Sequence, residues 1–327
     1  MRAVAILRLL CLCAVLACTG PDAQKAGSSL PKLRVTFNPH LSWGPLMIAQ
    51  AEGFFREEGV EVEFVSALRP EEALVALVSG DIDVNPGPPH AGFLSAIAQG
   101  AKIRIAAGQG HLTRGGCTYY GIVLRRGLDP ARPSAIARMR VSQDGMTRFV
   151  ATRLLADHKV NLNAIETVRL PDAVQAMSLE QGTLDAVAAT EPSLTRLTKV
   201  GTLWLSGQDA LPDFQWGVIA FGARLLHRER DTGIRFIRAY NRGVAQYREG
   251  KTPRNLAIIA EATGEPPELL REACWLDFST DSYLNWESVA AFQQWANDEG
   301  LMEHTLSRDQ AWDSTFVSAA RQTTPAP

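Results

Sequence analysis

A short pattern occurs twice along this chain, and it constrains the fold more than any other feature of the sequence. Residues 77–83 read LVSGDID and residues 179–185 read LEQGTLD, with leucine, glycine, an aliphatic residue and aspartate at the same spacing. In each copy a helix is expected to end at the glycine, and a strand is expected to begin at the aliphatic residue that follows. The repetition predicts two similar lobes, each an open α/β sheet.

Alternating strand and helix patterns surround both copies of this motif. Around the first copy we predict strands at 33–37, 60–64 and 82–84 and helices at 45–52 and 71–78. Around the second copy we predict strands at 139–142, 168–170 and 184–187 and helices at 146–157 and 172–179. Such alternation is typical of a largely parallel sheet. After a strand at 217–221 the patterns become helical, at 232–247, 253–262, 267–274 and 286–299.

The first residues have the pattern of an export signal. A basic start precedes an apolar run at 3–17 that ends in a small residue, which predicts a signal peptide removed after residue 17. Residues 15–18 (VLAC) resemble a lipobox, so we expect Cys18 to be lipidated and to tether the protein to the membrane. Leu16 is not the small residue that a lipobox prefers, and ordinary cleavage remains the alternative. Residues 18–32 are predicted to be a flexible tether.

The charge and the hydrophobic content of the chain argue against a nucleic-acid-binding protein and against a disordered one. The formal net charge is −2, so the chain lacks the basic footprint of a nucleic-acid-binding protein. A hydrophobic content of 46% allows a sizeable core. Cys117 and Cys274 lie far apart in the sequence, and neither has a second cysteine or a histidine at metal-ligand spacing. We expect two buried free thiols, with a disulfide as the alternative.

Four segments, taken in order, resemble a known family. Residues 45–60 (PLMIAQAEGFFREEGV), 77–84, 98–103 and 182–192 are similar to parts of the solute-binding proteins of ABC importers for nitrate, sulfonates, taurine and thiamine-pyrimidine precursors. The resemblance covers most of residues 33–301. It implies a monomeric receptor, without cofactor or catalytic role, in the periplasm or at the cell surface. Such a receptor hands a small molecule to the permease subunits in the membrane.

The resemblance also implies how the lobes are assembled. The fold is expected to be periplasmic binding protein-like of type II, with lobe I formed by 33–118 and 225–320 and lobe II by 119–224. Two strands would form the hinge, with crossings near 117–120 and 216–221. The last residues, 321–327, are expected to be a disordered tail. Ligand binding is expected to select a closed arrangement of the lobes.

The ligand site of an open α/β fold is expected beyond the carboxyl ends of its strands. This rule selects the loops at 38–44, 86–90 and 143–147, the corner at 191–192 and the two lobe crossings. The candidate ligand-binding residues there are Trp43, Pro89, His90, His111, Tyr119, Gly145, Met146, Thr147, Glu191 and Trp216. The flat rings of Trp43, Tyr119 and Trp216 favour a small heteroaromatic ligand such as a pyrimidine. His90, His111 and Glu191 can form hydrogen bonds to its ring nitrogens or to an amine. An alkyl sulfonate held by helix N–H groups is the competing hypothesis.

Several candidates have a structural alternative. His90 is expected to cap a helix that starts near residue 91, and Asp83 and Asp185 are expected to fix turns or strand ends. The sequence has no nucleophile motif and no metal-binding spacing. Two other functions remain open. One is an enzyme related to thiamine-pyrimidine synthesis, although this chain lacks the cysteine-rich run of those enzymes, and the other is a ligand sensor on the same fold.

Overall fold

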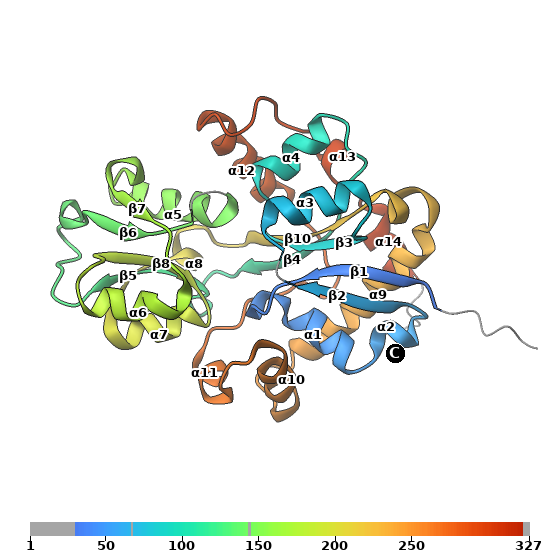
Figure 1. Ribbon diagram of the computed structural model, residues 1–327, viewed down its shortest axis with the longest axis horizontal. Helices are drawn as coiled ribbons and strands as arrows, with labels where there is room; N and C mark the ends of the chain where they lie inside the picture. Colours follow the sequence, from blue (N-terminus) through green and yellow to red (C-terminus); the bar gives the residue numbers. More distant parts are fainter. Residues whose placement is uncertain (1–29, 67, 143–144, 323–327) are drawn as a thin grey trace, which may run out of the picture.

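The computed structural model describes residues 30–66, 68–142 and 145–322 (Figure 1). The expected signal peptide, Cys18 and most of the predicted tether lie outside the described residues. Two lobes lie side by side in the view, and each is built around its own five-stranded sheet. Within the described ranges, no helix has the combination of length and apolar character needed to cross a membrane.

The first sheet has the strand order β2-β1-β3-β10-β4. Strand β1 runs parallel to β2 and β3, whereas β10 runs antiparallel to β3 and β4. The bounds of these strands are β1 (Lys32–Phe37), β2 (Glu61–Ser66), β3 (Val84–Gly87), β4 (Arg104–Leu112) and β10 (Phe214–Phe221).

The second sheet repeats this plan, with the order β7-β6-β8-β5-β9. Strand β6 is parallel to β7 and β8, and β5 is antiparallel to β8 and β9. Its strands are β5 (Tyr120–Arg125), β6 (Arg138–Arg140), β7 (Glu166–Val168), β8 (Ala186–Thr190) and β9 (Gly201–Ser206). The prediction of two α/β lobes on one plan is confirmed.

Helices cover both sheets, and the helical C-terminal part packs mainly on the first lobe, where α9 contacts α1, α2 and α14 (Figure 1). The helices before strand β10 are α1 (Gly44–Ala51), α2 (Phe54–Glu57), α3 (Pro70–Ser79), α4 (Ala91–Ala98), α5 (Gly145–Asp157), α6 (Asp172–Glu180), α7 (Ser193–Val200) and α8 (Gly207–Ala210). The later helices are α9 (Arg230–Tyr247), α10 (Pro253–Thr263), α11 (Pro267–Glu272), α12 (Trp286–Asp298), α13 (Arg308–Ala311) and α14 (Thr315–Gln322).

The aspartates of the repeated motif have the same structural role in the two lobes. Asp83 accepts a hydrogen bond from the backbone N–H of Arg34 at 2.9 Å and donates its own N–H to the carbonyl of that residue. Asp185 exchanges the same pair of bonds with Arg138 in the second lobe. Both aspartates therefore fix strand ends, as the sequence predicts, although the strands themselves begin one residue later, at Val84 and Ala186.

One lobe boundary differs from the prediction. The segment 214–221 was expected in lobe II, but strand β10 lies in the first sheet because its backbone pairs with β3 on one side and β4 on the other. The return crossing is therefore formed by residues 207–213, whereas the outward crossing, 113–119, is near its expected place.

The inner ends of the predicted tether and tail belong to regular secondary structure. Lys32 belongs to β1, where its backbone is aligned with Glu61 and its Nζ lies 2.6 Å from a carboxylate oxygen of Glu63. At the other end, Arg321 and Gln322 complete helix α14, and the guanidinium of Arg321 lies 2.6 Å from Asp281. Pairing and ion-pair contacts therefore order residues that the sequence assigned to the tether and the tail.

The prediction of two free thiols is wrong, because Cys117 and Cys274 form a disulfide across a sequence separation of 157 residues. Cys117 lies in the outward crossing, and Cys274 follows helix α11. Two ion pairs hold the same C-terminal segment against helix α7 of the second lobe: Arg196 with Glu265, and Lys199 with Glu272. The segment around α11 thus spans the two lobes beside the hinge.

Candidate functional site

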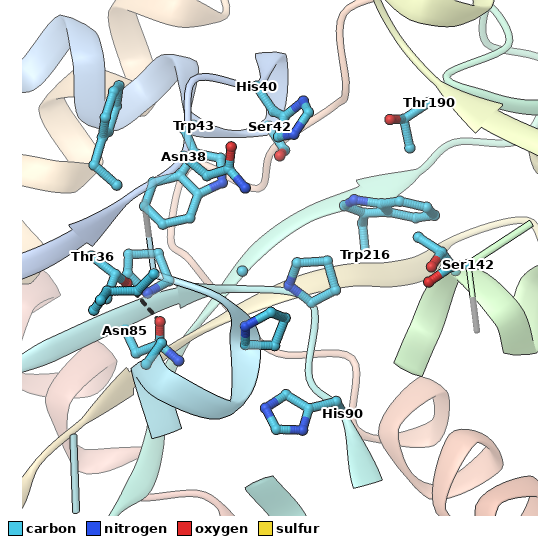
Figure 2. A pocket seen from close by; sticks show the side chains of 18 of the residues that line it. Thr36, Asn38, His40, Ser42, Trp43, Asn85, His90, Ser142, Thr190 and Trp216 are labelled. Carbon is cyan, nitrogen blue, oxygen red and sulfur yellow. Dashed lines mark hydrogen bonds between the residues drawn. The ribbon is translucent and has the colours of Figure 1, made fainter. Parts of the chain in front are cut away.

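A pocket of about 360 Å³ opens between the two sheets (Figure 2). Such a volume suits a small organic molecule. In the close-up, Thr36 and Asn85 of the first lobe lie on one side, Ser142 and Thr190 of the second lobe lie on the other, and Trp216 lies between them. The pocket therefore has walls from both lobes, and Trp216 belongs to strand β10 of the first sheet, which directly follows the return crossing.

Aromatic side chains form a rigid part of this wall. Trp43 is only 5% exposed and packs edge-on against Phe37, with 5.8 Å between the ring centroids. Trp216 is 2% exposed and packs edge-on against Tyr119 at 5.4 Å. Burial raises the pKa of Tyr119, whose hydroxyl is hydrogen-bonded to Ser42, so the phenol stays protonated. Because these rings are held by their neighbours, they present fixed apolar surfaces to the pocket.

The loop between β1 and α1 carries polar side chains into the pocket. It begins with a tight turn, in which the N–H of His40 donates to the carbonyl of Asn38 at 2.8 Å, and it continues as a 3-10 turn, Leu41–Trp43. The buried amide of Gln109 on strand β4 donates to the carbonyl of Ser42 at 3.0 Å and fixes the loop on the sheet. Asn38, His40 and Ser42 consequently line the pocket.

The pocket has no fixed charge on its described lining. Among the residues of the described ranges that line it, none is a lysine, arginine, aspartate or glutamate. Desolvation lowers the pKa of His40, so this imidazole is neutral at neutral pH. The lining offers hydroxyl, amide and neutral imidazole groups for hydrogen bonding, which suits an uncharged ligand better than an anion.

One polar pair lies at the end of the first sheet. The hydroxyl of Thr36 on β1 donates to Oδ1 of Asn85 on β3 at 2.6 Å (Figure 2). The loop predicted at 86–90 is shorter than expected, since Pro86 and Gly87 continue strand β3. Asn85 is therefore a strand residue beside the pocket.

Five of the ten predicted site residues line the pocket. They are Trp43, His90, Tyr119, Thr147 and Trp216. His90 also fills its predicted structural role, because its Nδ1 accepts a hydrogen bond from the N–H of Phe93 at 3.3 Å and caps helix α4.

The other five predicted residues lie outside this lining. Pro89 and Gly145 meet where the lobes touch: a Cβ built on Gly145 would lie 3.5 Å from Cβ of His90 and 3.8 Å from the carbonyl oxygen of Pro89. Met146 is buried in the second lobe. His111 lies away from the pocket, with its Nε2 at 3.5 Å from Oδ2 of Asp277.

Glu191 lies in the hinge region and not in the pocket. Its carboxylate accepts hydrogen bonds from the N–H and the hydroxyl of Thr195 and from the N–H of Cys274. Burial raises the pKa of Glu191, whereas these three bonds favour its charged form. The Glu-Pro corner of the sequence therefore joins helix α7 to the C-terminal segment at the disulfide.

The sequence did not single out Thr36, Asn85, Ser142 and Thr190, all of which line the pocket. Thr36, Ser142 and Thr190 lie near, at or just after the carboxyl end of a strand, where the fold places ligands, whereas Asn85 is the second residue of the short strand β3. The available signal was a polar residue in or near a short strand, as at Thr190, which ends the apolar strand β8. It does not reveal which face of the sheet the side chain occupies, and that face decides whether the residue reaches the pocket.

The described residues contain no group of three or more His, Cys, Asp or Glu arranged to hold a metal ion.

A comparison with models of known protein families shows which family the chain belongs to. The model of the NMT1-like family matches residues 26–262, which is more than half of the sequence.

The chain belongs to the NMT1-like family. This membership confirms the resemblance found in the sequence. No protein of curated function matches this NMT1-like chain in sequence.

Solved structures share the fold of this NMT1-like protein. The ligand-binding component of an ABC-type import system from Staphylococcus aureus, solved with zinc bound, is 14% identical with a TM-score of 0.73, covering 89% of this chain and 99% of that chain. The alkanesulfonate-binding protein SsuA from Xanthomonas axonopodis pv. citri, bound to MOPS, is 16% identical with a TM-score of 0.68 and coverages of 86% and 98%. The desulfurization enzyme DSZB is 14% identical with a TM-score of 0.67 and coverages of 89% and 99%. At these identities the likeness shows the fold alone.

Proposed function

We propose that this protein is the extracytoplasmic receptor of an ABC importer and that it captures a small, uncharged heteroaromatic molecule, such as a pyrimidine, between its lobes. The observation that carries the ligand class is the uncharged pocket, whose rigid walls are Trp43 and Trp216. The flat faces of these rings suit a planar ligand, and neutral polar groups around them can bond to ring nitrogens. Delivery to permease subunits follows from the solute-binding fold and the family.

An alkyl sulfonate is the competing ligand. It is favoured by the start of helix α5, where Thr147 lines the pocket close to the first N–H groups of a 13-residue helix. Against it stands the absence of cationic side chains from the described pocket lining. A buried anion without such a partner is costly to desolvate, and a helix terminus compensates only part of that cost.

A thermal-shift series tests the ligand class. We expect 4-aminopyrimidine or a related heterocycle to stabilise the protein, by about 2.7 kcal/mol at a hundredfold excess over the dissociation constant. Taurine, alkyl sulfonates and nitrate are expected to give no shift. The variant Trp43→Ala should lose most of the shift, measured from its own ligand-free transition. Trp204→Ala, which changes a half-buried tryptophan outside the pocket, should keep it.

The series has a clear contrary outcome. If sulfonates or nitrate alone raise the transition temperature, the ligand is an anion and the heteroaromatic assignment fails. If turnover of a bound compound accompanies binding, the protein is an enzyme like DSZB in fold. The two cysteines within the described ranges argue for binding over thiol chemistry, because they are joined in a disulfide and do not line the pocket.

We also propose that the protein is exported and acts as a monomer tethered through a lipid on Cys18. The motif at 15–18 and the polar segment after it support this anchor. We expect intact-mass analysis of the membrane fraction to show a mature chain that begins at a lipid-modified Cys18. The variant Cys18→Ala should leave the membrane as a soluble chain or remain an uncut precursor. An unmodified Cys18 in the mature chain would exclude the anchor.

A further inference from the structure

Resting on the proposed function, the structure assigns to Asn85 the role of a fixed hydrogen-bond donor to the ligand, with Thr36 as the residue that fixes it. Thr36 binds the oxygen end of the Asn85 amide, with 2.6 Å between Oγ1 and Oδ1. The close-up shows this bond and shows the amide nitrogen on the side of Asn85 away from Thr36 (Figure 2). A side-chain amide can turn over and exchange its two ends. In the opposite orientation the Thr36 hydroxyl would accept from Nδ2, and its own proton, on a side chain that is only 6% exposed, would lose the acceptor that Oδ1 supplies, so the orientation with Oδ1 toward Thr36 is favoured.

The amide nitrogen Nδ2 of Asn85 makes no hydrogen bond to the described part of the protein. Asn85 is half-buried on strand β3 and lines the pocket together with Thr36, which is 6% exposed. Both side chains come from paired strands, since β1 and β3 lie side by side in the first sheet. The donor is therefore held on a rigid element, as selective recognition requires.

A fixed donor at Nδ2 of Asn85 predicts that the ligand has a hydrogen-bond acceptor facing this atom. A ring nitrogen or a carbonyl oxygen satisfies Nδ2, whereas a group that only donates leaves it unpaired. An unpaired polar group in a closed pocket lowers affinity by roughly 10- to 100-fold. Asn85 therefore determines specificity through direct contact, and Thr36 is a positioning residue that acts through it.

Two probes and three variants test this assignment. The probes are 4-methylpyrimidine, whose ring nitrogens only accept hydrogen bonds, and 4-aminopyrimidine, which also donates. The measurement is the ratio of their dissociation constants by calorimetry. Asn85→Asp keeps the oxygen that binds Thr36 and replaces the donor by an acceptor. We expect this variant to lose at least about tenfold in affinity for 4-methylpyrimidine and to keep most of its affinity for 4-aminopyrimidine.

Two variants of Thr36 distinguish its role in orienting the Asn85 amide from its contribution to packing. Thr36→Val removes the hydroxyl at nearly constant shape, so the amide can turn over and the ratio should move toward that of Asn85→Asp. Thr36→Ser restores the hydroxyl and should restore the wild-type ratio. If the wild type binds both probes and the ratio is unchanged in Asn85→Asp and Thr36→Val, the assignment is overturned while the proposed function stands. If the wild type binds neither probe, the proposed function itself fails.

Discussion

Replacing both Cys117 and Cys274 by serine is expected to lower the free energy of unfolding by about 5 kcal/mol. The bridge joins residues 157 positions apart, and in the chain-entropy model a closed loop of this length restricts the unfolded chain by that amount. The double variant avoids the free thiol that a single substitution would leave. Urea unfolding of the oxidised wild type and of the variant, each extrapolated to water with its own urea dependence, measures the difference in the free energy of unfolding.

Reduction supplies the control for this experiment. A reductant should shift the wild-type transition to that of the double variant and should leave the double variant unchanged. The bridge also holds the segment after α11 on the outward crossing, where Glu191 accepts the N–H of Cys274. A difference below about 1 kcal/mol would mean that this network, and not the covalent bond, maintains the hinge region.

Gly145→Val is expected to lower ligand affinity by about a hundredfold, because it holds the two lobes apart. Gly145 lies at the start of α5, and a Cβ placed there would already touch Cβ of His90 on the other lobe at 3.5 Å. The two γ-methyl groups of valine require further space. Overpacking of this kind costs up to about 3 kcal/mol, or about two decades of affinity.

Gly182→Val is the matched control. Gly145 and Gly182 have nearly the same left-handed backbone, with φ of +68° and +72°, so the backbone strain of valine is similar at both. Around Gly182, however, nothing lies within 4 Å of a built Cβ. Calorimetry with 4-aminopyrimidine should show lost affinity only for Gly145→Val. X-ray scattering at saturating ligand should show a larger radius of gyration for that variant, and equal radii would contradict the closure argument.

The fold was largely predictable because its main signals are local. The motifs at 77–83 and 179–185 place a glycine after a helix and an aspartate beside a strand, and these are properties of a few consecutive residues. The same reasoning placed Asp83 and Asp185 correctly at strand ends. The membership of β10 in the first sheet was not predictable in this way, since hydrogen bonds with distant strands decide it.

The site was less predictable for the same physical reason. A sequence does not state which of two faces a strand residue occupies, so Thr36 and Asn85 gave no signal, although both line the pocket. Glu191 was a candidate because of its position in the chain, but the approach of Cys274 placed its carboxylate in the hinge network. The disulfide itself depends on a contact between residues far apart in the sequence, and thiol spacing does not reveal such a contact.

The place of β10 in the first sheet has a consequence for the order in which the lobes are completed. Among the strands of the described residues, β4 pairs in the first sheet with β10 alone, and β10 ends at Phe221. A chain that leaves the translocation machinery with its N-terminus first therefore exposes β4 as an unpaired edge until the whole second lobe has emerged. The second sheet, whose strands all lie within 120–206, is complete earlier. On the proposed export route, the second lobe can therefore complete its sheet before the first lobe receives its last strand, β10.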